Sequence, residues 1–302
     1  MTAQVTDLQY VAHAVPDMAA ERKFYGETWG LTEVGEEDGK VYFAAEGSTH
    51  PFVIRLRQDV EKKTDLIGFC AATRADVDAI FAQAMAAGAK AIAQPGPASG
   101  PGGGYAARFF DPEGRALEVN CETQRRVARK LGTGEAIPVG LSHAVLHSPD
   151  MPSLQKFYED VLGFKLSDSI AKFMVFLRCN PVHHRLAILP GKPALNHVAF
   201  DVSSIDEMMR GLGRLTKEGV KLSWGPGRHT AGNNTFTYYL TPNGNAVEYT
   251  SDLEEVDEAT WVPKTYPMRP DITDQWGTGR IIMGNVPHQT MDADKGLWCV
   301  PT

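Results

Sequence analysis

The sequence lacks long hydrophobic runs and has few cysteines. No stretch reaches the roughly 18 consecutive apolar residues that a membrane-spanning helix needs. The first residues contain neither a basic segment nor an apolar one, so we expect no secretory signal and a cytoplasmic location. No two cysteines form a C-x-x-C pair, which excludes a zinc ribbon and a thioredoxin-like motif. We expect reduced, mostly buried thiols at Cys70, Cys121, Cys179 and Cys299.

Positive charge is also in the minority. The chain has 30 Lys and Arg against 37 Asp and Glu, a formal net charge of −7. Non-specific binding to nucleic acid requires clustered positive charge, so we expect neither nucleic acid nor a membrane as a partner. The 302 residues, 43% of them hydrophobic, are enough for about two domains with sizeable cores.

The chain contains an internal repeat. LQYVAHAVPDM at residues 8–18 aligns without a gap with LSHAVLHSPDM at residues 141–151. LIGF at 66–69 then aligns with LNHV at 195–198, and DPEGRALE at 111–118 aligns with TPNGNAVE at 241–248. Such self-similarity indicates two copies of one structural unit. We predict an N-terminal domain at residues 1–130, a C-terminal catalytic domain at 131–252 and a tail at 253–302.

Each copy divides again into two similar modules. LSHAV at 141–145 resembles LNHVA at 195–199, and both alternate as strands do. Pro149-Asp150-Met151 opens a predicted helix that ends near Gly163, and Ser203-Ser204 caps another that runs to about Gly219. Further β-rich runs follow at 173–177, 185–189, 235–240 and 246–250. The predicted unit is β-α-β-β-β, present four times, in an α+β fold with largely antiparallel strands.

Two histidines and a glutamate are candidate metal ligands. His143 and His197 occupy equivalent places in consecutive modules, and Glu248 lies on a late strand of the second. If the modules pair about a pseudo-twofold axis, all three side chains can meet in one cleft. Two His and one carboxylate, with open positions, is the donor set of non-haem iron(II) oxygenases.

The N-terminal half is an internal control for this assignment. A lone histidine in a strand is more often structural than a ligand, so the spacing alone would be weak. The aligned positions of the first copy hold Tyr10, Gly68 and Glu118, so only one of the three donor types is repeated. Packing alone would tolerate similar residues in both copies. We therefore predict a metal in the C-terminal half and a degenerate site in the N-terminal half.

Over roughly residues 8–252 the sequence resembles the two-domain extradiol ring-cleavage dioxygenases of the vicinal oxygen chelate (glyoxalase/bleomycin resistance) superfamily. The most specific part is GRH at 227–229 followed by YYLTPNGNAVE at 238–248, which is similar to the family's ring-cleavage signature. NPVHHRLA at 180–187 resembles its paired-histidine segment. Thr237 stands where the family usually has an aliphatic residue or Phe, and Gly232-Asn233 where biphenyl-type members carry Asp-His. Both departures concern the substrate more than the reaction.

The resemblance implies a fold, a reaction and a set of roles. The fold is four βαβββ modules in two tandem vicinal-oxygen-chelate domains. The reaction inserts both atoms of O₂ into a catechol-type diol chelated to Fe(II), with Mn(II) as the alternative metal, in aromatic-compound catabolism. The three ligands above would hold the metal and His184 would act as acid–base residue. Tyr238 and His229 would hydrogen-bond the substrate. Family members are usually homo-oligomers.

Several points stay open at this stage. If residues 183–184 belong to a strand, His183 points away from the site and only His184 is catalytic. Phe173, Met174, Val175 and the segment near Trp224 are candidate pocket residues. The tail at 271–279 is predicted either to fold over the cleft or to mediate subunit contacts. The alternatives are a glyoxalase-like isomerase or thiol transferase, which commonly uses an additional protein ligand, and a metal-free ligand-sequestering protein on the same scaffold.

Overall fold

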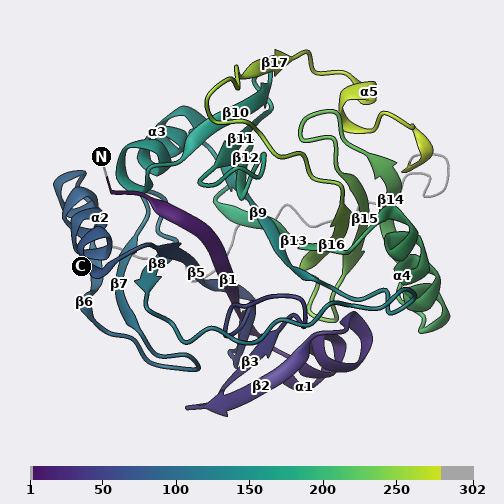
Figure 1. Ribbon diagram of the computed structural model, residues 1–302, viewed down its shortest axis with the longest axis horizontal. Coiled ribbons are helices and arrows are strands. Elements are labelled where there is room, and N and C mark those ends of the chain that lie inside the picture. Colours follow the sequence, from purple (N-terminus) through teal and green to yellow (C-terminus); the bar gives the residue numbers. More distant parts are fainter. Residues whose placement is uncertain (1–2, 280–302) are drawn as a thin grey trace.

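The computed structural model describes residues 3–279, and its elements follow the predicted pattern of four β-α-β-β-β modules and a tail (Figure 1). The N-terminal half comprises β1 (Val5–Val15), α1 (Met18–Lys23) with the π-helical segment η1 (Phe24–Trp29), β2 (Thr32–Glu37), β3 (Lys40–Ala44), β4 (Ile54–Gln58), β5 (Lys63–Ala71), α2 (Arg74–Ala86), β6 (Ala91–Pro97), β7 (Tyr105–Phe110) and β8 (Ala116–Cys121).

The C-terminal half repeats this order and adds the tail. It comprises β9 (Gly140–Ser148), α3 (Met151–Leu162), β10 (Lys165–Ile170), β11 (Met174–Arg178), β12 (Leu186–Pro190), β13 (Ala194–Asp201), α4 (Ile205–Lys217), β14 (Leu222–Arg228), β15 (Thr235–Leu240) and β16 (Ala246–Ser251). The tail contributes β17 (Lys264–Tyr266) and α5 (Pro270–Thr273).

Each half forms one sheet with internal twofold symmetry. The strand orders are β2-β3-β4-β1-β5-β8-β7-β6 and β14-β15-β16-β13-β9-β12-β11-β10-β17. The first strands of the two modules run antiparallel at the centre, as β1 with β5 and β9 with β13. Each also pairs in parallel with the last strand of its own module. The pseudo-twofold axis passes between the central strands, which confirms the predicted pairing of modules.

The helices of the C-terminal half begin and end where the sequence predicts. The side chain of Asp150 accepts a hydrogen bond from the backbone N–H of Ser153 and caps α3, and Gly163 ends it in the left-handed conformation at φ +75°. Ser204 caps α4 by accepting from the N–H of Glu207. These capping residues fix where each helix begins after its strand. They therefore also fix which residues of the preceding strand belong to the sheet.

The two halves share an aromatic core. Trp29 of the first module packs against Phe200 and Tyr249 of the fourth, with ring centroids 5.6 Å and 4.0 Å apart. Phe69 of the second module contacts Tyr158 of the third at 6.5 Å. Each such aromatic side chain buries a large apolar area and contributes about 1.5–3 kcal/mol. The halves are therefore joined by their hydrophobic core as well as by the chain.

A turn of each half also docks on the other half. The guanidinium of Arg115 is fully buried, lies 2.9 Å from the carboxylate of Asp111 and donates to the backbone carbonyl of His147. On the opposite side, the side-chain amide of Asn243 donates to the buried carboxylate of Glu21 at 2.8 Å. The aligned D-P-E-G and T-P-N-G segments thus serve as equivalent docking turns.

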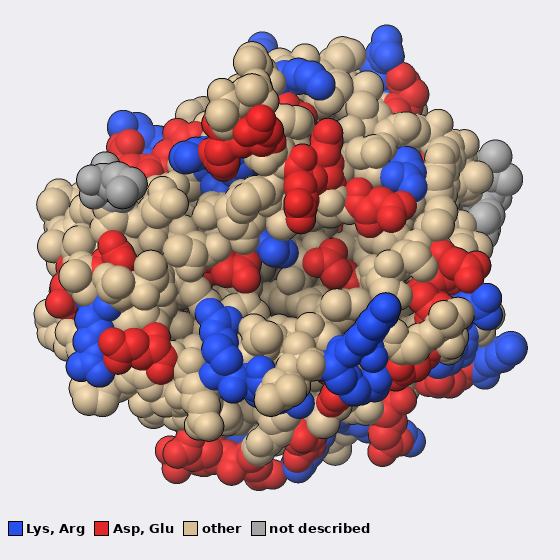
Figure 2. All heavy atoms as spheres, in the orientation of Figure 1, with Lys and Arg blue, Asp and Glu red and all other residues tan. Residues whose placement is uncertain are grey.

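The surface charges and the cysteines agree with what the sequence predicts. Within residues 3–279, no helix combines the length and the apolar composition that a membrane crossing requires. Acidic and basic side chains are interspersed over the face shown in Figure 2. Cys70, Cys121 and Cys179 are free and buried, as expected, whereas Cys299 lies outside the described residues.

Candidate metal centre

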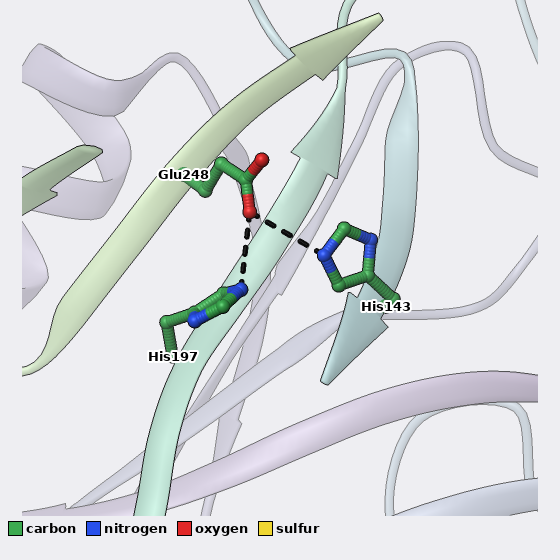
Figure 3. Close-up of side chains that lie close together, drawn as sticks. All are labelled: His143, His197 and Glu248. Carbon is green, nitrogen blue, oxygen red and sulfur yellow. Dashed lines mark ion pairs between the residues drawn. The ribbon is translucent and has the colours of Figure 1, made fainter. Parts of the chain in front are cut away.

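Three side chains from three neighbouring strands converge in the C-terminal half (Figure 3). His143 comes from β9, His197 from β13 and Glu248 from β16, and their ligand atoms all lie within 4.8 Å of one another. Nε2 of His143 and Nε2 of His197 are 3.3 Å and 3.1 Å from Oε2 of Glu248. The structure therefore brings the three predicted ligands into one buried cluster.

Strand register explains why these residues meet. Ala199 of β13 pairs with His143 on one side and with Glu248 on the other, so the three lie in one row across the sheet. His197 lies two residues earlier on β13, on the same face, because side chains alternate along a strand. The small side chain of Ala199 leaves space at the centre of the row.

The unpaired atoms of this cluster fit a divalent cation. Nε2 of His197 and both carboxylate oxygens of Glu248 are buried and have no hydrogen-bond partner of acceptable geometry. Leaving such a group unpaired costs about 1–3 kcal/mol, more if it is charged. Nδ1 of His197 lies 2.6 Å from the amide oxygen of Asn196, so Nδ1 is the donor and Nε2 keeps its lone pair. The donor set is N,N,O, which suits Fe²⁺ and Mn²⁺.

The charge state of Glu248 also favours binding of a divalent cation. Burial by itself would raise the pKa of this carboxyl group, but the closeness of the His143 and His197 rings outweighs burial and holds its pKa well below the usual range. Glu248 is therefore a carboxylate at neutral pH, the form in which it can bind a cation.

Internal symmetry identifies a fourth position that carries no ligand. β12 pairs with β9 as β16 pairs with β13, so Ala187 stands opposite Val145 as Glu248 stands opposite Ala199. Val145 follows His143 by two residues, as Ala199 follows His197. Ala187 thus occupies the place equivalent to Glu248, and its methyl group cannot coordinate. The cluster has three protein donors among the described residues, and the symmetry-related fourth place, at Ala187, offers none.

A cavity of about 360 Å³ adjoins the three ligands. Its wall is mostly apolar, and no Lys, Arg, Asp or Glu is among the described residues that line it. The predicted pocket residues Phe173, Met174 and Trp224 are confirmed, whereas Val175 packs against the main core. The tail folds over the cleft, the first of its two predicted placements, and adds Met268, Ile272 and Thr273 to the wall.

His184 lines this cavity beside the ligands. Its ring centroid is 4.4 Å from that of His143, and burial lowers the pKa of His184 well below its usual range, with neighbouring histidines adding to the effect. The ring is neutral at physiological pH and can accept a proton. The location agrees with the acid–base role that the sequence suggested.

The prediction for His183 is wrong. Residues 181–184 precede β12 and are irregular, so strand alternation does not separate the two histidines. His183 is fully buried, its Nδ1 lies 3.0 Å from Nδ1 of His184, and its Nε2 lies 3.1 Å from Oδ2 of Asp168. His183 is therefore linked to the site and is not a surface residue.

Tyr238 and His229 lie on the opposite wall. Tyr238 of β15 stands directly across from Glu248, and its ring centroid is 5.0 Å from that of His197. Burial raises the pKa of Tyr238 well above its usual range, which keeps the hydroxyl protonated, and burial lowers the pKa of His229. Both side chains are thus neutral and suited to hydrogen-bonding a ligand in the cavity.

The N-terminal half has a different set of residues at the equivalent place. β1 and β5 pair Tyr10 with Gly68 and Ala12 with Leu66, so Leu66, and not Gly68, corresponds to His197. The sequence alignment was two residues out of register here, since β-bulges interrupt both strand pairs. Gly68 corresponds to Ala199, and a Cβ at Gly68 would lie 2.1 Å from the ring of Tyr10. The ring of Tyr10 therefore occupies the space beside Gly68.

Arg108 accompanies Glu118 in that half. Arg108 pairs across the strands with Glu118, as Tyr238 pairs with Glu248, and its guanidinium lies 2.7 Å from the carboxylate. A fixed positive charge therefore balances Glu118, the carboxylate that is equivalent to Glu248.

Sequence reasoning missed three groups that contact site residues. Asn196 directly precedes a ligand histidine and bonds its Nδ1, a position that could have been read as a supporting residue. Asp168 lies on β10 without any motif, and the carbonyl oxygen of Thr273 belongs to the backbone of the tail. The last two have no signal in the side-chain pattern.

A sequence model of the Glyoxalase/Bleomycin resistance protein/Dioxygenase superfamily matches this chain twice. The matched ranges are residues 7–119 and 140–249, which correspond to the two sheets. The tail with β17 and α5 follows the second match.

Individual relatives cover most of the chain. Biphenyl-2,3-diol 1,2-dioxygenase of Paraburkholderia xenovorans is 30% identical over 90% of this chain and 95% of its own length. An iron-dependent extradiol dioxygenase of Rhodococcus jostii is 32% identical over 52% of this chain and 59% of its own length. A solved structure described as the Mn(II)-bound glyoxalase from Novosphingobium aromaticivorans is 47% identical, with a TM-score of 0.93 and 98% of each chain covered.

Proposed function

The chain belongs to the Glyoxalase/Bleomycin resistance protein/Dioxygenase superfamily, and within it we propose an extradiol dioxygenase that cleaves the ring of a catechol-type diol. The observation that carries the proposal is a three-donor cluster open toward an apolar cavity. Bidentate binding of a diol needs free positions on the ion, and O₂ needs one more. Ala187 adds no fourth donor, and the cavity that adjoins His143 and His197 has room for both.

The proposed metal is one Fe²⁺ per chain, bound by His143, His197 and Glu248, with Mn²⁺ as the alternative. Both ions accept N,N,O ligands, and availability decides between them. When bound, the ion would activate the chelated diol and O₂ toward each other, so that both oxygen atoms enter the ring-opened product. The proposed N-terminal domain at residues 1–130 holds no metal in this account.

The remaining polar residues of the cavity handle protons and orientation. His184 is neutral and stands beside the metal ligands, so it can take a proton from a diol hydroxyl. The Tyr238 hydroxyl stays protonated and can donate a hydrogen bond to the substrate oxygen that becomes negative. His229 contacts Tyr238 and holds its hydroxyl in place.

The cavity also suggests a class of diol. An engineered cavity of about 150 Å³ is large enough for benzene, and this one measures about 360 Å³. The wall offers apolar contacts from Ile170, Phe173 and Met174, and no Lys or Arg lines it within residues 3–279 to bind a carboxylate. We infer an uncharged catechol with a bulky apolar substituent, in preference to a carboxylated one.

A second candidate is a metal-dependent isomerase, because the solved structure described as a glyoxalase is 47% identical to this chain. Such sites commonly use an additional protein ligand. The place where symmetry would put that ligand holds Ala187, and the cavity beside the three donors is mostly apolar. These features support the dioxygenase over the isomerase.

Metal-loaded protein tests the two candidates directly. The full chain, reconstituted without air with Fe²⁺ or Mn²⁺, is mixed with a phenyl-substituted catechol, with catechol and with a carboxylated catechol while O₂ is recorded. We expect one O₂ consumed per diol and the highest kcat/KM for the phenyl-substituted substrate. Isomerisation of a thiol adduct of an α-keto aldehyde, without O₂ uptake from any diol, would reject the dioxygenase in favour of the second candidate.

A further inference from the structure

A chain of three side chains leads from the edge of the C-terminal sheet to the cavity. Oδ2 of Asp168 on β10 lies 3.1 Å from Nε2 of His183, and Nδ1 of His183 lies 3.0 Å from Nδ1 of His184. All three are buried, with at most 2% of each residue exposed. The far nitrogen of His184, Nε2, has no hydrogen-bond partner among the described residues, and the ring lines the cavity.

The direction of these hydrogen bonds follows from the donors available. A carboxylate only accepts hydrogen bonds, so Nε2 of His183 must be protonated and donate to Asp168. A neutral imidazole has one N–H, which leaves Nδ1 of His183 as an acceptor. Nδ1 of His184 must then be the donor between the two rings. Nε2 of His184 is left without a proton, as a base facing the cavity requires.

The surroundings hold this arrangement in place. Oδ1 of Asp168 accepts a hydrogen bond of 2.7 Å from the backbone N–H of Lys264 on β17, so the tail fixes the carboxylate. The ring of Trp261 packs edge-on against His183 with centroids 5.7 Å apart. A Cβ at Gly232, which has φ +79°, would lie 3.1 Å from Nδ1 of His183 and 3.2 Å from Cε1 of His184. Glycine there leaves room for the contact between the rings.

We propose that Asp168 and His183 are positioning residues that fix the tautomer of His184, with Nδ1 protonated and Nε2 free to take the substrate proton. The inference rests on the proposed function, because it assigns His184 to proton transfer from the diol. When Nε2 takes that proton, the Nδ1–H bond to His183 stays intact, and the new positive charge lies next to a ring already hydrogen-bonded to a carboxylate. Return of the proton to product restores the starting state.

Asp168→Asn is the sharpest test. The amide oxygen would keep the bond from Lys264 N–H, so the NH₂ group would face His183 and donate to its Nε2. His183 would then carry its proton on Nδ1 and donate to His184, whose own proton would move to Nε2. The same exchange in a Ser-His-Asp triad keeps the geometry and lowers kcat about 10⁴-fold. We expect kcat to fall roughly 10²–10⁴-fold, with KM and metal content within about threefold of the parent.

Two sets of variants separate positioning from folding. Asp160→Asn changes an exposed carboxylate on α3 and should leave kcat unchanged. His183→Asn keeps an acceptor near the place of Nδ1 and should retain at least ten times the kcat of His183→Leu. Equal losses in the Asn and Leu variants, or a loss in Asp168→Asn that resides in KM or metal content, would overturn the proposal.

Nuclear magnetic resonance of ring nitrogens provides a readout that does not depend on turnover. The full chain is labelled with ¹⁵N-histidine and loaded with Zn²⁺, a diamagnetic ion that accepts nitrogen and oxygen ligands. We expect the proton of His184 on Nδ1 in the parent and on Nε2 in Asp168→Asn. A proton on Nε2 in the parent would refute the tautomer assignment. Absence of ring cleavage with the expected tautomer would instead refute the proposed function alone.

Discussion

The hydroxyl of Tyr238 lies 3.2 Å from Nε2 of His229, and the backbone carbonyl of Thr273 lies 2.6 Å from the other nitrogen of the same ring. A carbonyl only accepts, so Nδ1 of His229 is protonated. Nε2 of the neutral ring accepts the Tyr238 hydroxyl hydrogen until a bound substrate oxygen replaces it as the acceptor. The tail thus determines how His229 faces the cavity. The site includes chain that lies outside both repeats.

Loss of the Tyr238 hydroxyl should impair turnover without affecting the metal. We expect Tyr238→Phe to lower kcat about 10–10³-fold, because one donor to a developing oxyanion is worth up to this much. Steady-state O₂ uptake and metal analysis measure the two quantities. Tyr239→Phe is the matched control, since Tyr239 faces the other side of the sheet and packs against Trp29. An equal loss in both variants would show that sheet packing, and not the hydroxyl, is responsible.

The equivalent glutamates of the two halves should differ in their effect on metal content. Glu248→Gln removes a charged donor from the three-residue cluster, and we expect bound iron to fall below about a tenth of the parent value. Glu118→Gln breaks the ion pair with Arg108, whose guanidinium keeps some contact with water, and should lower the free energy of unfolding by roughly 1–3 kcal/mol while iron stays at one per chain. Elemental analysis and urea unfolding give both values. Full iron in Glu248→Gln would contradict the assigned ligand set.

A fourth donor at Ala187 should occupy a position on the metal that the three candidate ligands leave free. We expect Ala187→Glu to retain or tighten the metal and to lower ring cleavage at least 10²-fold, because the added carboxylate would occupy a position that the diol needs. Ala187→Ser is the control for added volume and should keep most of the activity. Circular dichroism checks that the glutamate is tolerated at this buried place. Undiminished turnover in a folded Ala187→Glu protein would mean that substrate binds on another side.

His13 should make the protein sensitive to acid. Both of its ring nitrogens are buried without a partner, and burial lowers its pKa to about 4, with Lys62 adding to this effect and Asp65 opposing it. Between pH 6.5 and 4 the unfolded chain gains a proton that the folded protein does not, so the free energy of unfolding falls as the pH falls. The full loss is roughly 3 kcal/mol, reached near pH 4.

The internal repeat supplies the variant for this test. Leu146 aligns with His13 in the second copy and is fully buried. We expect His13→Leu to be more stable than the parent at pH 5 and to lose less stability between pH 7 and pH 5. Urea unfolding at the two pH values measures the difference. Parallel stability curves for parent and variant would show that His13 does not titrate in this range.

The cluster of candidate ligands could be predicted because the repeat supplies its own comparison. His143 and His197 stand where the first copy has other residue types, whereas Glu248 aligns with Glu118. Strand alternation and register then put the three side chains on one face. The modules, helix caps and strand order follow from the same local patterns. These are short-range signals, which is why they can be read from the sequence.

What could not be predicted depends on irregular backbone and long-range contacts. β-bulges interrupt the central strand pairs, which is why the alignment of Gly68 was two residues out of register. His183 reaches Asp168 and His184 because residues 181–184 leave the strand geometry that alternation assumes. The tail was predicted in outline only, since its contacts run through backbone groups such as Lys264 N–H and the Thr273 carbonyl.

The pairing of Arg108 with Glu118 has a consequence for the order of assembly. Arg108 supplies the positive charge that balances Glu118, so this carboxylate of the N-terminal sheet needs no ion from solution. The C-terminal sheet must acquire its positive charge from solution. Because the two sheets share one aromatic core, each half completes the packing of the other, and this packing involves no ion. Metal binding is then a separate step on the folded protein, and its rate depends on the supply of metal and not on the speed of folding.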